Sequence, residues 1–237
     1  MKSVLLKELK YFLNTPSIYF IIGIFLTICS LSFWVFPEPA PNIFDYGLAN
    51  LSTFFEFSPW LILLLAPLIT MGVISEEKKE KTIELLLTKP IYEIELVLGK
   101  FLASLILIII TFFPTIIYIF CIQELSSNDI DIGQIISGYI GLILISSCFI
   151  SIGIFFSSLT NKQLVAFILS FSTILFFLLG ITMIQKITSI DFLSILSFSD
   201  RFEGFQKGII DLKDVIFFIS ISLIFLLLTA DQLKRER

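Results

Sequence analysis

Histidine is absent from the chain, and only three of its 237 residues are cysteine. Without an imidazole, the zinc-protease motifs and every catalytic site that uses histidine as its base are excluded. Cys29, Cys121 and Cys148 lie in apolar stretches without metal-site or disulfide spacing, so we expect packing roles for them. The Gly-rich loop of a P-loop ATPase is also missing. We therefore expect no catalytic, cofactor-binding or metal-ligating residues in this chain.

Charged residues are scarce as well. They make up 15% of the chain and hydrophobic residues 57%, whereas a soluble domain has roughly 25% charged and about 45–50% apolar residues. A chain of this length could not bury so much apolar surface away from water. The composition excludes an ordinary soluble enzyme and indicates that lipid is the solvent. The net charge of −4 gives no reason to expect a nucleic-acid partner.

Six stretches are free of charged residues. Five of them reach, or come within one residue of, the roughly 20 residues that a helix needs to cross a membrane. The last stretch is shorter and can cross only if neighbouring residues are included in the span. We predict an all-α integral membrane protein with six transmembrane helices, forming a single transmembrane domain over residues 1–237. The predicted spans are 17–36, 58–75, 101–122, 136–157, 164–184 and 214–230.

Basic residues set the orientation, because short cytoplasmic loops carry an excess of Lys and Arg. With both termini in the cytoplasm, twelve of the sixteen basic residues lie on the inner side and four on the outer side. We therefore predict cytoplasmic termini. No charge lies at mid-membrane depth, where ion sites and proton relays usually carry one.

The first residues predict an amphipathic helix that lies in the cytoplasmic interface. Leu5, Leu9, Phe12 and Leu13 share one side of a helical wheel, and lysine and other polar residues share the opposite side. Thr15–Ser17 contains a proline that lets the chain turn into the membrane. Either this elbow helix only anchors the chain, or it also contacts a cytoplasmic partner.

The segment between spans two and three carries an amphipathic helix of its own. Its mixed-charge start is followed by an apolar stripe at Ile83, Leu86 and Leu87. Pro90 ends the pattern, because the residue before a proline is pushed out of the helical region. The pattern favours docking of a cytoplasmic protein, and a helix lying on lipid is the alternative.

Apolar residues at helical spacing also mark the outer segment before the last span. Phe202, Phe205 and Ile209 predict a short helix with Ser199 or Asp200 as its N-cap, and another is expected around 192–196. Such helices could cover the outer mouth of a pathway or anchor in the outer leaflet.

Small and proline residues in the spans predict how the helices pack. Gly141, Gly153 and Ser157 belong to a set of small residues spaced four apart, which favours close helix packing over the lining of a pathway. Pro67 and Pro114 are expected to kink their spans.

Residues 76–91, EEKKEKTIELLLTKPI, resemble the cytoplasmic signature of ABC-2 type transporter permeases, and LVLGK at 96–100 fits the same family. The N-terminal LKYFLNTPSIYF, the outer SFSDRFEGFQKGIIDLKDVIFF and the six-span layout fit it too. Within the family, the chain is most similar to GldF, the permease subunit of gliding-motility-associated ABC transporters, for example in FWVFPEP and IGIFFSSLTNKQLVAF.

This resemblance implies a permease subunit of an ATP-driven exporter in the bacterial inner membrane, associated with gliding motility. A separate, GldA-like ABC ATPase subunit would bind ATP and Mg, so this chain would not itself be an enzyme. A second permease copy or a related membrane subunit would pack beside it in the lipid. The residues that would couple to the ATPase are Glu76, Glu77, Thr82, Ile83, Glu84, Leu86, Leu87, Thr88 and Pro90. Phe202, Phe205 and Ile209 would gate the outer mouth.

Two positions depart from the family pattern. Lys81 stands where the family often has glycine, and Arg201 precedes Phe202 where an aromatic residue or histidine is frequent. Two alternatives stay open: an ABC-2 permease for lipid, polysaccharide or drug export without a tie to motility, and a membrane scaffold that does not transport.

Overall fold

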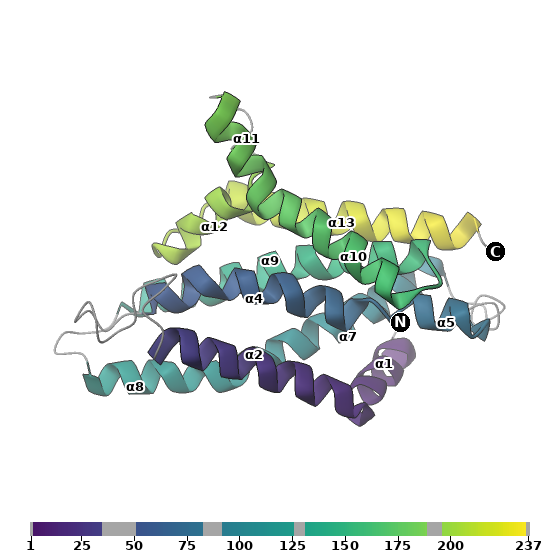
Figure 1. Ribbon diagram of the computed structural model, residues 1–237, viewed down its shortest axis with the longest axis horizontal. Helices are drawn as coiled ribbons and strands as arrows, with labels where there is room; N and C mark the ends of the chain where they lie inside the picture. The colour runs from purple at the N-terminus through teal and green to yellow at the C-terminus, as the bar shows by residue number, and fades with distance from the viewer. Residues whose placement is uncertain (1, 35–50, 83–91, 126–130, 189–195, 236–237) are drawn as a thin grey trace.

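Every regular element in the computed structural model is helical across the residues that it describes, which are 2–34, 51–82, 92–125, 131–188 and 196–235 (Figure 1). Two segments depart from α geometry, the 3₁₀ turn η1 (Phe113–Ile116) and the π-helix η2 (Phe176–Gly180). The α-helices are α1 (Lys2–Asn14), α2 (Pro16–Trp34), α4 (Ser52–Thr70), α5 (Ser75–Lys79), α7 (Glu93–Phe112), α8 (Ile117–Leu125), α9 (Ile132–Leu159), α10 (Gln163–Leu175), α11 (Ile181–Thr188), α12 (Phe198–Gln206) and α13 (Leu212–Arg235).

Within those described ranges, six helices are long and apolar enough to cross a membrane, which confirms the predicted all-helical, six-span fold. Several extend beyond the predicted spans, because a helix need not end where the hydrocarbon ends. They run over Pro16–Trp34, Ser52–Lys79, Glu93–Glu124, Ile132–Leu159, Gln163–Gln185 and Leu212–Arg235.

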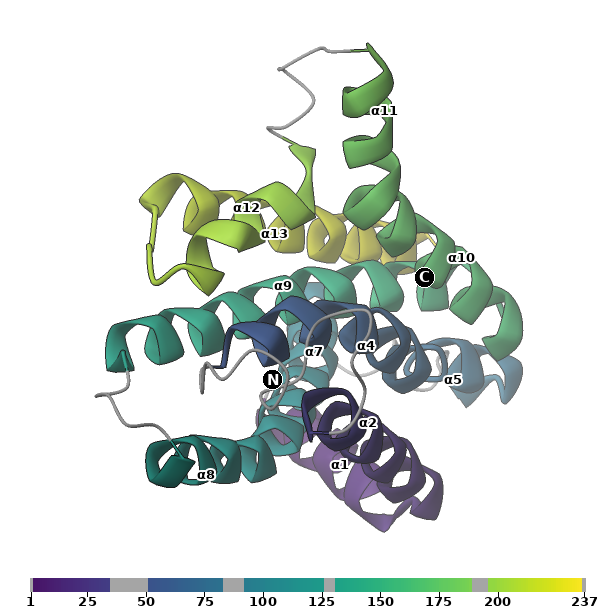
Figure 2. The ribbon, with the colours of Figure 1, turned by 60° about the vertical axis from the view of Figure 1, so that its left-hand side comes forward.

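The centre of the bundle is formed by α4 and α9. Helix α9 contacts α4, α7, α10, α12 and α13, and both central helices bury most of their residues (Figure 2). By contrast, α2, α10 and α13 expose large apolar side chains such as Phe20, Leu164 and Leu227. An apolar outer surface suits lipid or another membrane-spanning chain. Helix α11 projects away from the rest of the bundle (Figures 1 and 2).

Glycines of α9 allow its neighbours to approach closely. A Cβ atom at Gly153 would lie 2.0 Å from the Thr70 hydroxyl of α4, and one at Gly141 would lie 2.7 Å from the Phe205 side chain of α12. The predicted role of these small residues in helix packing is therefore confirmed for both glycines.

The two prolines behave differently. Pro114 lies in η1, where the α-helix of the third span gives way to a 3₁₀ turn, as expected of a residue that cannot donate a backbone hydrogen bond. Pro67 lies inside α4, which continues to Thr70. The π-helix η2 interrupts the fifth span without a proline, and no sequence signal predicted it.

The two ends of the bundle carry different elements. Helices α1 and α5 and both chain termini lie towards one end, at the right of Figure 1. Helix α12 lies towards the other end. This arrangement brings α5, the start of the predicted coupling segment, to the same end as the elbow helix. The side of the membrane that each end faces stays a prediction.

Candidate functional site

The predicted coupling residues divide into two groups. Glu76 and Glu77 lie in α5, and Thr82 follows it, donating its hydroxyl hydrogen to the backbone oxygen of Glu77 at 3.2 Å. The remaining predicted positions lie outside the described residues; these are Ile83, Glu84, Leu86, Leu87, Thr88 and Pro90. The structure therefore describes the entry to the coupling segment.

A single serine of α9 fixes the direction in which α5 leaves α4. The Ser157 hydroxyl accepts hydrogen bonds from the backbone N–H groups of Ile74 and Ser75, at 3.1 and 3.0 Å, and donates to the Met71 carbonyl at 3.0 Å. These are the groups that a helix terminus leaves without partners. Lys78 adds a bond from its ammonium group to the backbone oxygen of Ser158. Helix α5 is thus tied to the end of α9.

Lys100 of α7 joins three other parts of the chain through one buried ammonium group. The side chain is 1% exposed, and its Nζ donates to Glu8 Oε1 of α1 at 2.9 Å and to the backbone oxygen of Val73 at 2.7 Å. It also lies 2.9 Å from Glu77 Oε2, an ion pair without hydrogen-bond geometry. Lys7 of α1 reaches the other oxygen of Glu77 at 3.3 Å. Ions buried in this way need partners, because desolvation costs several kcal/mol each.

Close contact between α1 and α7 makes this ion cluster possible. A Cβ atom at Gly99 would lie 3.0 Å from the Val4 side chain of α1, so glycine allows the helices to approach there. Val4, Glu8 and Phe12, spaced four apart, form the buried face of α1. The predicted stripe of Leu5, Leu9, Phe12 and Leu13 coincides with this face only in part. Phe12 is buried, Leu5 and Leu9 are half-buried and Leu13 is exposed, whereas Glu8 is buried in its ion pair with Lys100. In LVLGK, glycine therefore permits the approach and lysine binds α1.

Tyr11 provides a second link between α1 and α5. Its hydroxyl donates to Glu76 Oε2 at 2.9 Å. Burial first, and then this hydrogen bond and the negative charge of Glu76, raise the pKa of Tyr11 to about 12. The tyrosine is therefore a neutral hydrogen-bond donor under all physiological conditions.

Lys81 has the backbone conformation that glycine prefers. Its φ is 56°, and it is the one non-glycine residue with positive φ in the described part of the chain. A side chain in this left-handed region costs about 1–2 kcal/mol. The substitution of lysine for the frequent family glycine therefore leaves the turn geometry in place and adds strain at the exit of α5.

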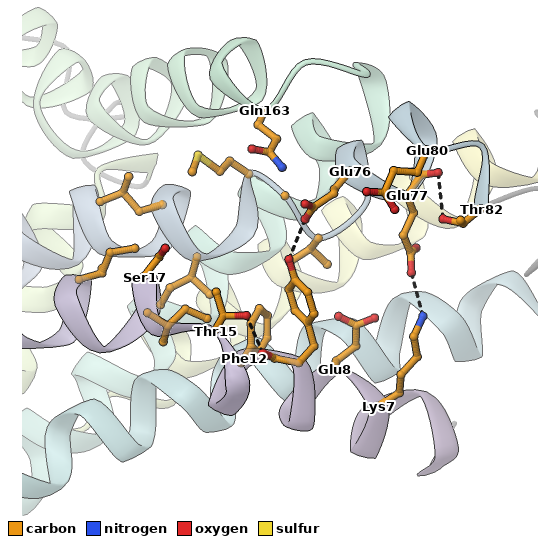
Figure 3. A pocket seen from close by; sticks show the side chains of 18 residues that line it. Lys7, Glu8, Phe12, Thr15, Ser17, Glu76, Glu77, Glu80, Thr82 and Gln163 are labelled. Atoms are coloured by element: carbon orange, nitrogen blue, oxygen red, sulfur yellow. Dashed lines mark hydrogen bonds and ion pairs between the residues drawn. The ribbon is translucent and has the colours of Figure 1, made fainter.

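A groove of about 580 Å³ runs between the elbow helix, α2, α4 and α5 (Figure 3). Tyr11 reaches Glu76 and Lys7 reaches Glu77 along one part of it, and Gln163 at the start of α10 borders it from another element. Among the described residues, no group of three or more His, Cys, Asp or Glu side chains is placed to hold a metal ion. The groove is lined by four carboxylates, one lysine, hydroxyl and amide groups and apolar side chains.

The predicted outer-gate residues lie in two different environments. Phe202 and Phe205 of α12 are buried, and both approach Gly141 of α9. Ile209 is 62% exposed and lies beyond the end of α12. The predicted N-cap was wrong, because Ser197, rather than Ser199 or Asp200, accepts the capping bond from the Asp200 N–H at 3.2 Å.

Sequence reasoning missed Glu8, Lys100 and Ser157 as parts of this junction. Glu8 was not singled out in the amphipathic pattern, and Lys100 was counted as a basic residue at the edge of a span and as the last residue of LVLGK. An ionisable residue at the border of an apolar run is one available signal for Lys100. Its partners lie 92 and 23 positions away in the chain, so no local pattern could identify them.

Comparison with known proteins agrees with this architecture. The sequence profile of the family described as ABC-2 family transporter protein matches residues 42–230. No curated protein matches the chain. The match covers most of the chain, including four of the six candidate spans in full and the last one up to position 230. The chain is therefore a multi-pass membrane protein that belongs to the ABC-2 family of transporter proteins.

Proposed function

We propose that this chain is the permease subunit of an ATP-driven exporter, and that a separate ABC ATPase subunit docks on α5 and the residues that follow it, up to position 91. ATP and Mg would be bound by that partner. The observation that carries the proposal is the way in which α5 is attached. Side chains of α1, α7 and α9 all bind it or the turn before it.

Such attachment suits the transmission of movement. A displacement of α5 would act on the elbow helix through Glu77 and Glu76, on α7 through Lys100, and on α9 through Ser157. Packed helices and ion pairs transmit force when they have two discrete arrangements that a ligand can favour unequally. ATP binding to the partner would supply that difference in free energy.

Further subunits and the outer gate belong to the same proposal. The apolar outer faces of α2, α10 and α13 would contact lipid and a second permease copy or a related membrane subunit. Phe202, Phe205 and Ile209 would border the outer exit. The association with gliding motility rests on the similarity to GldF, and a GldA-like ATPase is the corresponding partner.

Purification from the native membrane tests the central claim. The tagged chain, isolated in mild detergent, should bring with it a stoichiometric subunit that contains a P-loop, identified by mass spectrometry. Replacing Leu86 and Leu87 by Asp should abolish this association and leave membrane insertion intact. Leu212→Asp, at an exposed position at the other end of the bundle, is the matched control. A chain that purifies alone with nucleotide present would favour the scaffold alternative.

Localisation and motility have their own tests. Single cysteines at Glu80 and Asp129, in a chain without native cysteines, should react from opposite sides of the inner membrane. Labelling of both from outside contradicts cytoplasmic termini. A deletion strain should lose gliding, and normal gliding would favour a permease for lipid, polysaccharide or drug export.

A further inference from the structure

The groove beside the elbow helix combines two kinds of surface. One part is apolar, with Phe12, Ile18, Ile21, Leu68 and Ile69 among its lining residues. These side chains belong to the last turn of α1, the first turns of α2 and the last turns of α4. Because α2 and α4 are candidate membrane spans, the apolar part of the groove continues into the hydrocarbon region.

The other part of the groove is acidic and only partly neutralised. Glu8 and Glu77 are paired with Lys100, and Glu77 also with Lys7. Across the described ranges, no cation lies within ion-pair distance of Glu76 or Glu80, the two further carboxylates that line the groove. Two negative charges therefore face the groove without a counter-ion from the described part of the chain.

Tyr11 reports the same negative potential. Its hydroxyl faces Glu76, and Glu8 and Glu80 also lie near enough to act on it. After burial, these three carboxylates are what raises its pKa to about 12. A positive charge placed in the groove would be attracted by the same field, and an anionic headgroup would be repelled.

We propose that this groove binds an amphiphile with a protonated amine at its head and an apolar chain, with the amine at Glu76 and Glu80 and the chain along α2 and α4. The volume of about 580 Å³ is within the range of ligand pockets and accommodates a headgroup with the first part of its chain. A small hydrophilic amine does not fit as well, because it would leave the apolar wall in contact with water. Identifying the bound amphiphile as the exported substrate rests in addition on the proposed function.

Photocrosslinking tests the binding. The purified full-length chain in maltoside micelles, whose headgroups are uncharged, is mixed with hexadecylamine that carries a diazirine on its chain. Hexadecanol with the same diazirine is the matched probe without charge. The amine should label peptides that contain Ile18, Ile21 or Leu68 much more strongly than the alcohol does. Equal labelling by both probes, or labelling only of the outer faces of α2 and α13, overturns the proposal.

Substitution of the carboxylates tests the charge selection. Glu76→Gln with Glu80→Gln keeps a hydrogen-bond acceptor for Tyr11 and removes both free charges. Two partly exposed ion pairs predict about tenfold weaker labelling by the amine, with labelling by the alcohol unchanged. Glu124→Gln, an exposed carboxylate in α8, should leave both unchanged. Undiminished labelling of the double variant by the amine contradicts the assignment of these two residues.

The outcomes separate this inference from the proposed function. The binding assay needs neither the ATPase nor nucleotide. A chain that co-purifies with an ATPase and is not labelled in the groove would retain the permease proposal and lose this one. Groove labelling in a chain that purifies alone would retain this inference and contradict the permease proposal.

Discussion

Replacing Lys100 by methionine should destabilise the junction of the elbow helix strongly. Methionine fills a similar volume but removes the ammonium group that contacts Glu8, Glu77 and the Val73 carbonyl. Removing one partner of a buried ion pair typically costs about 3–5 kcal/mol, because an uncompensated charge stays buried. We therefore expect a loss of about 3–5 kcal/mol.

The assay is thermal denaturation of the purified chain in detergent, followed by size-exclusion chromatography. The expected loss lowers the midpoint by on the order of 10 °C for a chain of this size. Lys207→Met is the control, since its ion pair with Glu203 at 2.5 Å is exposed and should contribute less than about 1 kcal/mol.

A second variant decides whether unpaired charge is the cause. Adding Glu8→Gln to Lys100→Met removes one of the two stranded carboxylates, and Glu77 keeps its contact with Lys7 at 3.3 Å. The double variant should therefore be more stable than the single one by at least about 1 kcal/mol. A single variant as stable as the wild type, or a double variant that is no better than the single one, would refute the reasoning.

Three further predictions concern backbone strain, helix packing and titration. Lys81→Gly should raise the unfolding free energy by about 1 kcal/mol, since φ is 56° there, and an unchanged midpoint contradicts the strain. Gly153→Ala should lower the unfolding free energy by at least about 2 kcal/mol, because a Cβ would lie 2.0 Å from Thr70. Gly23→Ala is the control and should be neutral, because no atom lies within 4 Å of a Cβ there. The difference in phenolate absorbance between the wild type and Tyr11→Phe reports the titration of Tyr11, and its midpoint should lie near pH 12. The Tyr11 contact therefore stabilises the fold below pH 10 and stops doing so as the pH rises towards 12. A midpoint near pH 10 excludes the contact with Glu76.

The number of membrane-spanning segments and their helical character could be predicted from the sequence, because they depend on local composition. A stretch of about 20 apolar residues can satisfy its backbone hydrogen bonds in lipid only by forming a helix. Gly141 and Gly153 were also predicted correctly as packing residues, since small side chains in a span are favourable mainly where another helix approaches. The spacing of Phe202, Phe205 and Ile209 predicted a short helix, and α12 is found at Phe198–Gln206, with its N-cap at Ser197 and Ile209 beyond its end.

The assembly of the junction was decided only by the tertiary structure. The sequence determined a six-helix membrane protein with an amphipathic N-terminal helix, and by resemblance its family. It did not show that Glu8, Glu77 and Lys100 meet, because the partners come from α1, α5 and α7 and are paired only by the packing of those helices. The free carboxylates of the groove became visible for the same reason. A charge is neutralised by its neighbours in space, and these are fixed by the fold rather than by spacing along the chain.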